Sequence, residues 1–445
     1  MSTITIPAAN LPHAIRPEHA DYDAARAAWN LAADQRPAAV VIARDVADVL
    51  SAVRLARRHG LTIAPQGTGH LASALPDLDR TLLLKTAIGG VEVDVDARRA
   101  RVGAGAIWQD VVDAVTPHGL CALSGSSFDV GVVGYALGGG MSWLARSKGL
   151  LANNLHAIEI VTADGRVVRA SAEHEPDLFW ALRGGGGNFG VVTHVEMDLF
   201  PITSVFGGMT IWPAAQAREV LTAWARWAPT APDAVTTSLR LLRLPPLPDV
   251  PEPLRDIPVV CVDGAVVGGR GPELLADFRE VGTPILDTWA DMPPAGLVEI
   301  HMDPPAPVPA LGDTVNLRTV DDAAIDALLE VVDAGTVAPL LFAELRQLGG
   351  ALGREPDGAG ARAAFDGDFL LFGVGVPMSQ DHADALDARL TAMLDAMAPW
   401  ASDDRYMNFA ERGGWSGLQT SVRARLQAVR RAWDPERRFV GSHAV

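Results

Sequence analysis

The chain has 445 residues, more than one hydrophobic core usually holds, so two domains are expected. Its formal net charge of −17 opposes binding to nucleic acids or anionic membranes, which require basic surfaces. Hydrophobic residues make up 49% of the chain, which excludes a disordered protein. The N-terminus lacks the pattern of a secretory signal, and no apolar run reaches the ~18 residues of a membrane span. The default expectation is therefore a cytoplasmic protein.

Several common catalytic sites are not supported. The sequence contains no H-E-x-x-H, C-x-x-C, Walker or G-x-S-x-G motif, which argues against metal hydrolysis, NTP hydrolysis and the serine-hydrolase elbow. No metal site is predicted. The only cysteines, Cys121 and Cys261, lie in apolar surroundings, so we expect buried free thiols and no disulfide.

The first glycine-rich turn follows a predicted helix at residues 46–59 and a short apolar strand at residues 61–65. It reads Gln66-Gly67-Thr68-Gly69-His70. Glycine has no Cβ, so successive backbone N–H groups can converge here into a concavity suited to a pyrophosphate. A lone His after a glycine turn, such as His70, is more often an ordinary loop residue.

Two more glycine-rich segments follow in order. We expect a strand at residues 99–106, a helix at 107–115 and a glycine loop at 131–140. A strand over residues 153–165 closes in an Asp164-Gly165 hairpin turn, and a third loop at 183–190 precedes a strand at 191–200. A nicotinamide-binding Rossmann domain is not favoured. Its glycine formula at residues 185–190 precedes a strand instead of a helix, and Gly103-Ala-Gly105 has Trp108 at the third glycine position.

The middle of the chain has longer elements without regular βαβ alternation. Such a mixture predicts an α+β arrangement, an antiparallel sheet with helices on one side. Helices are expected at residues 214–227, 272–281, 321–334 and 380–397, and strands at 236–242, 259–267, 339–348 and 368–376. A Pro-rich stretch at residues 302–309 is expected to act as a rigid connector.

In order and spacing, residues 1–201 resemble the FAD-binding half of the berberine-bridge-enzyme-like oxidases, within the vanillyl-alcohol-oxidase superfamily. The resemblance resumes at Tyr406-Met-Asn408-Phe and Trp433-Asp434-Pro435. It implies a two-domain α+β flavoprotein. Residues 1–201 and 405–445 would form a discontinuous FAD-binding domain, and residues 202–404 a substrate-binding domain.

The resemblance also implies where FAD would bind. The implied cofactor-binding residues are Gln66, Gly67, Thr68, Gly69, His70, Leu71, Ser127, Val130, Gly131, Gly134, Gly138, Gly139, Gly140, Gly187, Val192 and Asn408. At the position of His70, family members carry an 8α-histidyl link to the flavin; the alternative is non-covalent FAD with His70 nearby. Many relatives have Arg where this chain has Gln66, so pyrophosphate binding would rely more on backbone amides.

Two positions bear on attachment and oxygen use. Ser127 aligns with the cysteine that joins the flavin C6 in bicovalent members, and serine cannot form that thioether, so no cysteinyl link is expected. Val130 aligns with a position where a small side chain is associated with oxygen access. This residue favours an oxidase over a dehydrogenase.

The catalytic candidates lie in the second half of the chain. Tyr406 matches the tyrosine of the family's Tyr-x-Asn motif, which in some members deprotonates the substrate, and a phenol needs a positive or hydrogen-bonding neighbour to act as a base. Two-residue alternation places Glu344 and Arg346 on one face of a strand, as cavity base and anchor or as a surface ion pair. His301 and Asp303 are weaker candidates.

The resemblance therefore implies an FAD-dependent oxidase. It would transfer a hydride from a small alcohol, sugar or secondary-metabolite hydroxyl or amine to flavin N5, and O₂ would reoxidise the flavin to give H₂O₂. Fold does not choose among these substrates. A dehydrogenase with another acceptor and a flavin-binding protein without turnover are the alternatives, and the sequence leaves the oligomeric state open.

Overall fold

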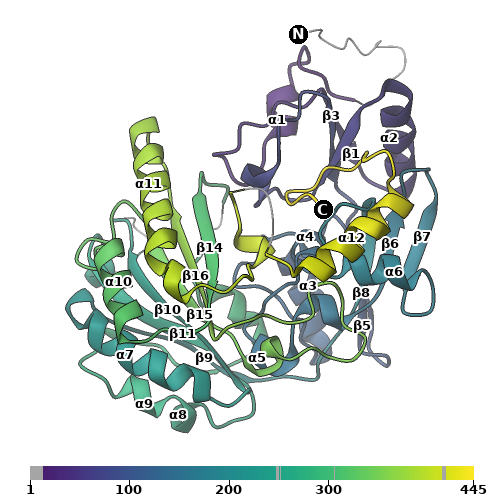
Figure 1. Cartoon of the computed structure of the whole chain (residues 1–445). Coiled ribbons are helices and arrows are strands. Elements are labelled where there is room, and N and C mark those ends of the chain that lie inside the picture. The colour runs from purple at the N-terminus through teal and green to yellow at the C-terminus, as the bar shows by residue number, and fades with distance from the viewer. Residues whose placement is uncertain (1–13, 247–249, 251, 305, 413–416) are drawn as a thin grey trace.

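Three β-sheets organise the chain in a computed structural model that describes residues 14–246, 250, 252–304, 306–412 and 417–445. Two sheets are built from strands within residues 39–198, and the third from strands within residues 205–375. Figure 1 shows these sheets in two lobes. The first lobe holds the two sheets of residues 39–198, and the second lobe holds the third sheet and its helices. The fold is α+β, and the sheet in the middle of the chain is antiparallel, as the sequence predicts.

The smallest sheet is parallel and has the order β1-β3-β2. Its strands are β1 (Ala39–Ala43), β2 (Thr62–Gln66) and β3 (Thr81–Thr86), and the short helix α1 (Tyr22–Arg26) precedes them. Helix α2 (Val46–His59) packs on this sheet with its residues Val49, Val53 and Ala56 buried. The helix begins where the Asp45 carboxylate accepts the Asp48 N–H, and it ends at Gly60 with φ +64°.

The second sheet is antiparallel, with the order β4-β5-β8-β6-β7. Its strands are β4 (Val91–Asp94), β5 (Arg99–Gly103), β6 (Leu155–Val161), β7 (Val167–Ser171) and β8 (Val191–Asp198). The helices between them are α3 (Trp108–Val115), α4 (Val132–Leu137), α5 (Ala145–Lys148) and α6 (Pro176–Leu182). The Asp164-Gly165 turn joins β6 to β7 as expected, with Gly165 at φ +81°. The loop expected at residues 131–140 is partly wrong, because its apolar centre folds as α4.

The third sheet has eight strands in the order β12-β9-β11-β10-β15-β16-β14, with β13 pairing to β9. They are β9 (Val205–Pro213), β10 (Val235–Arg243), β11 (Pro258–Val266), β12 (Leu286–Asp287), β13 (Ala290–Met292), β14 (Leu311–Leu317), β15 (Phe342–Gln347) and β16 (Phe369–Gly375). Its helices are α7 (Ala217–Trp227), α8 (Gly271–Leu274), α9 (Ala276–Arg279), α10 (Asp322–Val332) and α11 (Gln380–Met397). The helix expected at residues 272–281 is thus two short helices. Strands β9 and β14 were not predicted.

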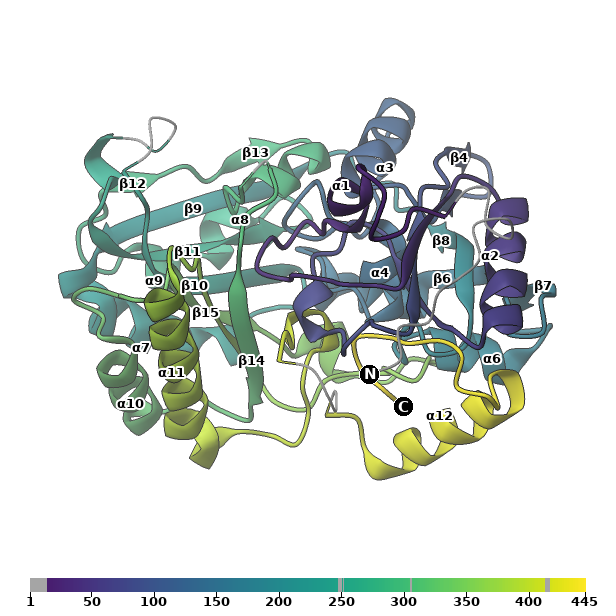
Figure 2. The same cartoon turned by 90° about the horizontal axis from the view of Figure 1, so that it is seen from above.

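Alternation along the central strands gives this sheet two different faces. Leu239 and Leu241 of β10 belong to the apolar core shared with α7, α10 and α11, which lie together on the outer side of the sheet (Figures 1 and 2). Ser238 and Arg240, between them, point to the opposite face and are also buried. That second face therefore carries buried polar groups, which need partners there.

The end of the chain returns to the first lobe. After Tyr406 a short turn (Met407–Phe409) leads to helix α12 (Thr420–Trp433), which packs beside α6. Farther on, the Val440 N–H donates to the Ile63 carbonyl and the Ile63 N–H to the Arg438 carbonyl. The C-terminal segment is thus hydrogen-bonded to β2, the strand that leads into the first glycine turn.

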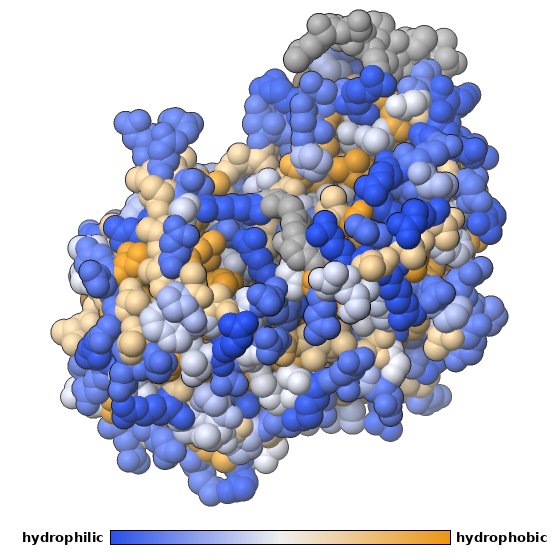
Figure 3. Space-filling model, in the orientation of Figure 1, coloured by the Kyte–Doolittle hydropathy of each residue, from blue (hydrophilic) through white to orange (hydrophobic). Residues whose placement is uncertain are grey.

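Two further expectations concern cysteines and the surface. Cys121 and Cys261 are buried free thiols, as predicted. Within the described residues, no helix is both long and apolar enough to cross a membrane. Hydrophilic side chains cover most of the face seen in Figure 3, with smaller apolar patches between them.

Candidate functional site

A cavity of about 410 Å³ lies between the glycine-rich segments of the first lobe and the polar face of the eight-stranded sheet. Most residues predicted for cofactor binding or catalysis share its wall. These are Gln66, Gly67, Thr68, Gly69, His70, Leu71, Ser127, Val130, Gly131, Gly134, Gly138, Gly187, Val192, Glu344, Tyr406 and Asn408. Residues far apart in the sequence therefore meet at one cavity.

The first wall of the cavity is made largely of backbone. A Cβ added at Gly134 or at Gly187 would meet no protein atom within 4 Å, so both glycines face open space. Gly139 and Gly140 do not line the cavity. They have positive φ values of +119° and +74°, and a Cβ on Gly140 would lie 2.6 Å from the Tyr135 ring. Both glycines follow Gly138, the C-cap of α4, and Gly140 allows close packing against Tyr135.

Gln66 is buried and already hydrogen-bonded within the protein. Its amide nitrogen donates to Gln35 at 2.8 Å, and the Lys85 ammonium donates to its Oε1 at 2.5 Å. Burial lowers the pKa of Lys85 to about 8. A cation that the sequence did not reveal thus stands directly behind the residue that replaces the family's arginine.

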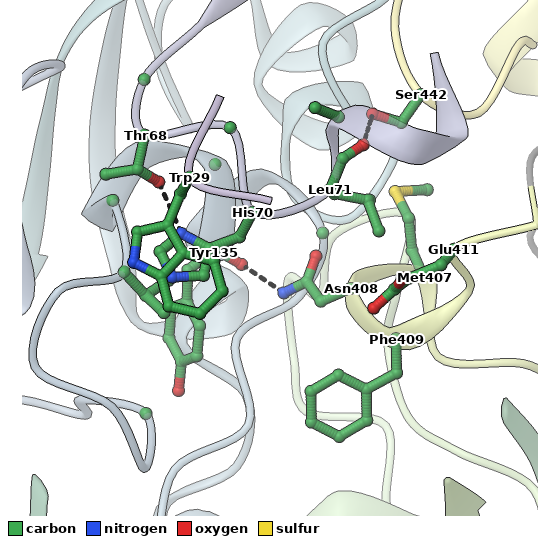
Figure 4. A pocket seen from close by; sticks show the side chains of 18 of the residues that line it. Trp29, Thr68, His70, Leu71, Tyr135, Met407, Asn408, Phe409, Glu411 and Ser442 are labelled. Atoms are coloured by element: carbon green, nitrogen blue, oxygen red, sulfur yellow. Dashed lines mark hydrogen bonds between the residues drawn. The ribbon is translucent and has the colours of Figure 1, made fainter. Parts of the chain in front are cut away.

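His70 is held on three sides, and Figure 4 shows two of them, Thr68 and Trp29. Its Nδ1 lies 2.8 Å from the Thr68 hydroxyl, and the Trp29 ring stacks on the imidazole with centroids 4.1 Å apart. Its Nε2 is buried and lies 3.5 Å from Oδ1 of Asp129. Trp29 and Asp129 were not identified from the sequence, although Asp129 lies in the Ser127–Gly131 segment that carries two predicted residues.

Ser127 and Val130 both line the cavity. The Ser127 hydroxyl donates to Asp129 at 2.9 Å. Cys121, the nearest cysteine in sequence, is buried and absent from the cavity wall, and burial raises the pKa of its thiol to about 12. Its thiol is therefore neutral and lies away from the cavity, whereas a thiolate is the reactive form of cysteine.

Tyr406 lies at the junction of the two walls. Its phenol oxygen accepts hydrogen bonds from the Met141 N–H and from the Asn408 amide, each at 3.0 Å. Burial raises the pKa of Tyr406, and these two donors with Arg346 and Arg362 offset that effect only in part. The helpful neighbours required of a phenolic base are present, yet the neutral phenol remains the favoured form.

Asn408 explains why residue 138 is glycine. Its amide also donates to the Tyr135 carbonyl at 3.0 Å, a bond seen in Figure 4. A Cβ on Gly138 would lie 1.7 Å from the Asn408 side-chain oxygen. The second glycine segment and the returning Tyr-x-Asn segment therefore fit together only when position 138 has no side chain.

The opposite wall carries a buried charge cluster. Arg346 donates to Glu344 at 2.8 Å, and Nε2 of His301 lies 3.2 Å from the same carboxylate. Behind them Arg240 pairs with Asp263, and both are buried. Burial opposes ionisation of Glu344, but Arg346 and His301 outweigh it and hold its pKa well below the usual range. Glu344 is fully buried, so the surface ion pair considered above is wrong.

Two more acids lie on the cavity wall. Asp303 lies 3.8 Å from Nδ1 of His301, and burial raises the pKa of Asp303. Glu411, which sequence reasoning missed, accepts the Gly312 N–H at 3.1 Å and the Ser73 hydroxyl at 3.5 Å. Burial raises the pKa of Glu411 to about 7. Its position three residues after Asn408 was the only signal available in the sequence.

The residues present fit FAD. A backbone wall with open space at Gly134 and Gly187 can approach a flat ring and a pyrophosphate closely, and His70 supplies a nucleophile at that wall. The opposite wall offers acids, a guanidinium and an imidazole for a polar substrate. Within the described residues, no cluster suited to a metal ion occurs.

Comparisons with known proteins agree with this arrangement. The family described as FAD binding domain matches residues 37–171. An (R)-6-hydroxynicotine oxidase of Paenarthrobacter nicotinovorans is 34% identical over 200 residues, which is 44% of each chain. An FAD-dependent monooxygenase of Fusarium proliferatum is 39% identical over 182 residues, 40% of this chain and 35% of that protein. The alignments with these curated relatives thus span less than half of their length.

Solved structures match over nearly the whole chain. The 6-hydroxy-D-nicotine oxidase of Arthrobacter nicotinovorans superposes with a TM-score of 0.82 at 25% identity, covering 96% of each chain. A berberine-bridge-enzyme-like protein of Physcomitrella patens superposes with a TM-score of 0.84 at 20% identity, covering 98% of each chain. The resemblance inferred from the glycine segments and the Tyr-x-Asn motif is confirmed.

Proposed function

We propose that this chain, a vanillyl-alcohol-oxidase-type protein with an FAD-binding domain, is an oxidase that takes a hydride from a small polar substrate and passes electrons to O₂. The substrate would be an alcohol, a sugar or a secondary-metabolite hydroxyl or amine. One observation carries the proposal: a single cavity joins a glycine backbone wall to a wall of charged side chains, with Tyr406 between them.

FAD when bound supplies the hydride acceptor, and the protein supplies binding, orientation and proton transfer. Tyr406 is the proposed base, because it lines the cavity and two N–H donors to its oxygen stabilise negative charge there. Asn408 holds that phenol against the second glycine segment. Glu344 and Arg346 bind polar groups of the substrate, and Glu344 is the second candidate for the base.

The cofactor is proposed to be attached through His70 alone. His70 lies on the backbone wall with both ring nitrogens close to polar side chains, while Ser127 occupies the only other attachment position. Val130 on the same wall is small enough to leave room for O₂, which supports an oxidase. The oxidase named among the relatives is consistent with this choice.

A substrate screen tests the proposal. The purified protein is mixed without oxygen with panels of alcohols, sugars and amines, and loss of the yellow flavin absorbance is followed by stopped flow. The proposal predicts that a member of one panel bleaches the flavin and that air restores the colour with release of H₂O₂. Bleaching that air does not reverse would identify a dehydrogenase. Bound flavin that no panel member bleaches would favour a binding protein without turnover.

A further inference from the structure

The cluster around His70 contains a carboxylate that the proposed hydride transfer does not use. Asp129 is absent from the cavity wall but lies behind His70, with its Oδ1 3.5 Å from Nε2. Ser127 and Trp29 both donate to the same carboxylate. Asp129 is 13% exposed and His70 24%, so the pair is largely shielded from solvent.

The surroundings of the imidazole distinguish its two nitrogens. Nε2 is closed off from solvent, and within the described residues it makes no hydrogen bond, so Asp129 is the acceptor within reach of a proton there. Nδ1 contacts the Thr68 hydroxyl, which can donate to a lone pair and rotate away. Trp29 fixes the ring plane, and its own backbone N–H is anchored to the Thr68 carbonyl at 2.9 Å.

We propose that Asp129 is a positioning residue for cofactor attachment, holding the His70 proton on Nε2 and accepting it as Nδ1 bonds to the 8α carbon of FAD. This inference rests on the covalent link in the proposed function. The Nδ1–C8α bond forms while one C8α–H bond and the Nε2–H bond break. The two protons and two electrons pass to O₂, giving H₂O₂, and the flavin finishes oxidised.

The electrostatics of the cluster suit this role. Burial opposes ionisation of Asp129, but His70, Ser127 and Trp29 together outweigh it and lower the pKa of the carboxyl. A carboxylate beside an imidazole fixes its tautomer and stabilises the cation that forms as the other nitrogen is alkylated. In hydrolase triads an aspartate likewise fixes the tautomer of a histidine and stabilises its cation, although there it does not take up the proton.

The test separates bond formation from FAD binding. Apoprotein made in riboflavin-limited cells is mixed with FAD in air, and flavin that stays on the acid-precipitated protein is followed with time. Asp129→Asn keeps the size of the side chain and removes its charge. We expect bond formation about 10²-fold slower than in wild type, the order lost with a general base. Asp129→Glu should restore part of the rate.

Non-covalent FAD affinity is measured where no bond can form. Adding Asp129→Asn to His70→Ala should change the FAD dissociation constant by less than about threefold, well under the tenfold change that corresponds to 1.4 kcal/mol of binding free energy. Asp198→Asn is the matched control, because Asp198 pairs with His156 at 2.5 Å and neither residue lines the cavity. It should attach FAD at the wild-type rate.

Three outcomes would contradict the inference in distinguishable ways. Wild-type protein that never retains flavin after acid would refute the covalent link of the proposed function itself. Wild type and Asp129→Asn attaching FAD equally fast would refute the role of Asp129 alone. Slow attachment accompanied by greatly weakened FAD binding would give Asp129 a structural role instead.

Discussion

The two walls of the cavity differ in how the chain builds them. The wall proposed to face the cofactor comes largely from the backbone of three glycine-rich segments, with a few side chains such as His70 and Val130 between them. The opposite wall comes from side chains on separate strands, such as Glu344 on β15 and Phe372 on β16, which are partners in the sheet register. The first wall suits a constant cofactor, and the second can vary with the substrate.

This difference predicts that mutations on the two walls should affect different properties of the protein. Changes on the backbone wall should alter flavin loading, and changes on the charged wall should alter substrate reaction or stability while FAD remains bound. The predictions below test that separation, beginning with the largest effect.

Replacing His70 with Ala should abolish acid-stable flavin completely, because His70 is the proposed point of attachment. The variant should still bind FAD through the glycine segments. Acid precipitation followed by absorbance of the pellet measures the first property, and FAD titration of the native apoprotein measures the second. Acid-stable flavin in the His70→Ala protein would show that attachment occurs elsewhere.

Replacing Tyr406 with Phe should slow flavin bleaching by substrate about 10²–10⁴-fold, the usual cost of losing general-base catalysis. The flavin content and reoxidation by O₂ should change little. Stopped-flow traces of both half-reactions measure these rates. A bleaching rate near that of wild type would exclude Tyr406 as the base and turn attention to Glu344.

The pH dependence of flavin bleaching is a second test of Tyr406 as the base. Because burial raises the pKa of Tyr406, its phenol is neutral at pH 7, and the rate of bleaching should increase as pH rises toward the pKa. Arg346 and Arg362 oppose the rise in pKa, and Tyr135 is the other tyrosine coupled to it. The increase should vanish in Tyr406→Phe. A slope that survives this substitution belongs to another group.

Breaking the Glu344 and Arg346 pair should destabilise the protein by about 3 kcal/mol per single substitution, because each removes a close partner of a buried charge. Glu344→Gln with Arg346→Met should cost less than the sum of the two single changes. Urea unfolding of the four proteins in this cycle measures the coupling. Additive costs would show that the two side chains do not stabilise one another.

The smallest effect is expected at Glu411. Its pKa is raised to about 7 in the folded protein, so the protonated form favours folding, and this contribution is lost as pH rises from about 4.5 through 7. Glu411→Gln keeps a neutral side chain and should be more stable than wild type at pH 8 by about 1–3 kcal/mol, with little difference at pH 4. An unchanged difference across this range would contradict the raised pKa.

The backbone wall of the cavity could be predicted from the sequence better than the charged wall. His70, Gly131, Gly134 and Gly187 were predicted because the glycine-rich segments that contain them resemble those of a flavoprotein family, and the structure brings all four to one cavity. Trp29 and Asp129 were missed because stacking and ion pairing with His70 depend on how separate segments fold together. Strand alternation placed Glu344 and Arg346 on one face, but only sheet pairing shows which face meets the cavity.

The fold shows a similar limit. Helix α2 was predicted with the bounds that the structure shows, whereas α4 was hidden inside a glycine-rich segment whose local propensity disfavours helices. Its apolar residues Val132, Val133, Ala136 and Leu137 are buried in the core of the first lobe. Tertiary burial, which the local sequence does not report, outweighs the propensity there.

The most direct test of the account is the cofactor content of the purified chain. Visible absorbance and total phosphorus count the flavin per chain, and phosphodiesterase releases AMP only from the dinucleotide. The account predicts one flavin per chain and one AMP released per flavin, with the flavin remaining on the peptide that contains His70. A colourless protein that also fails to take up added FAD would contradict the assignment of this cavity.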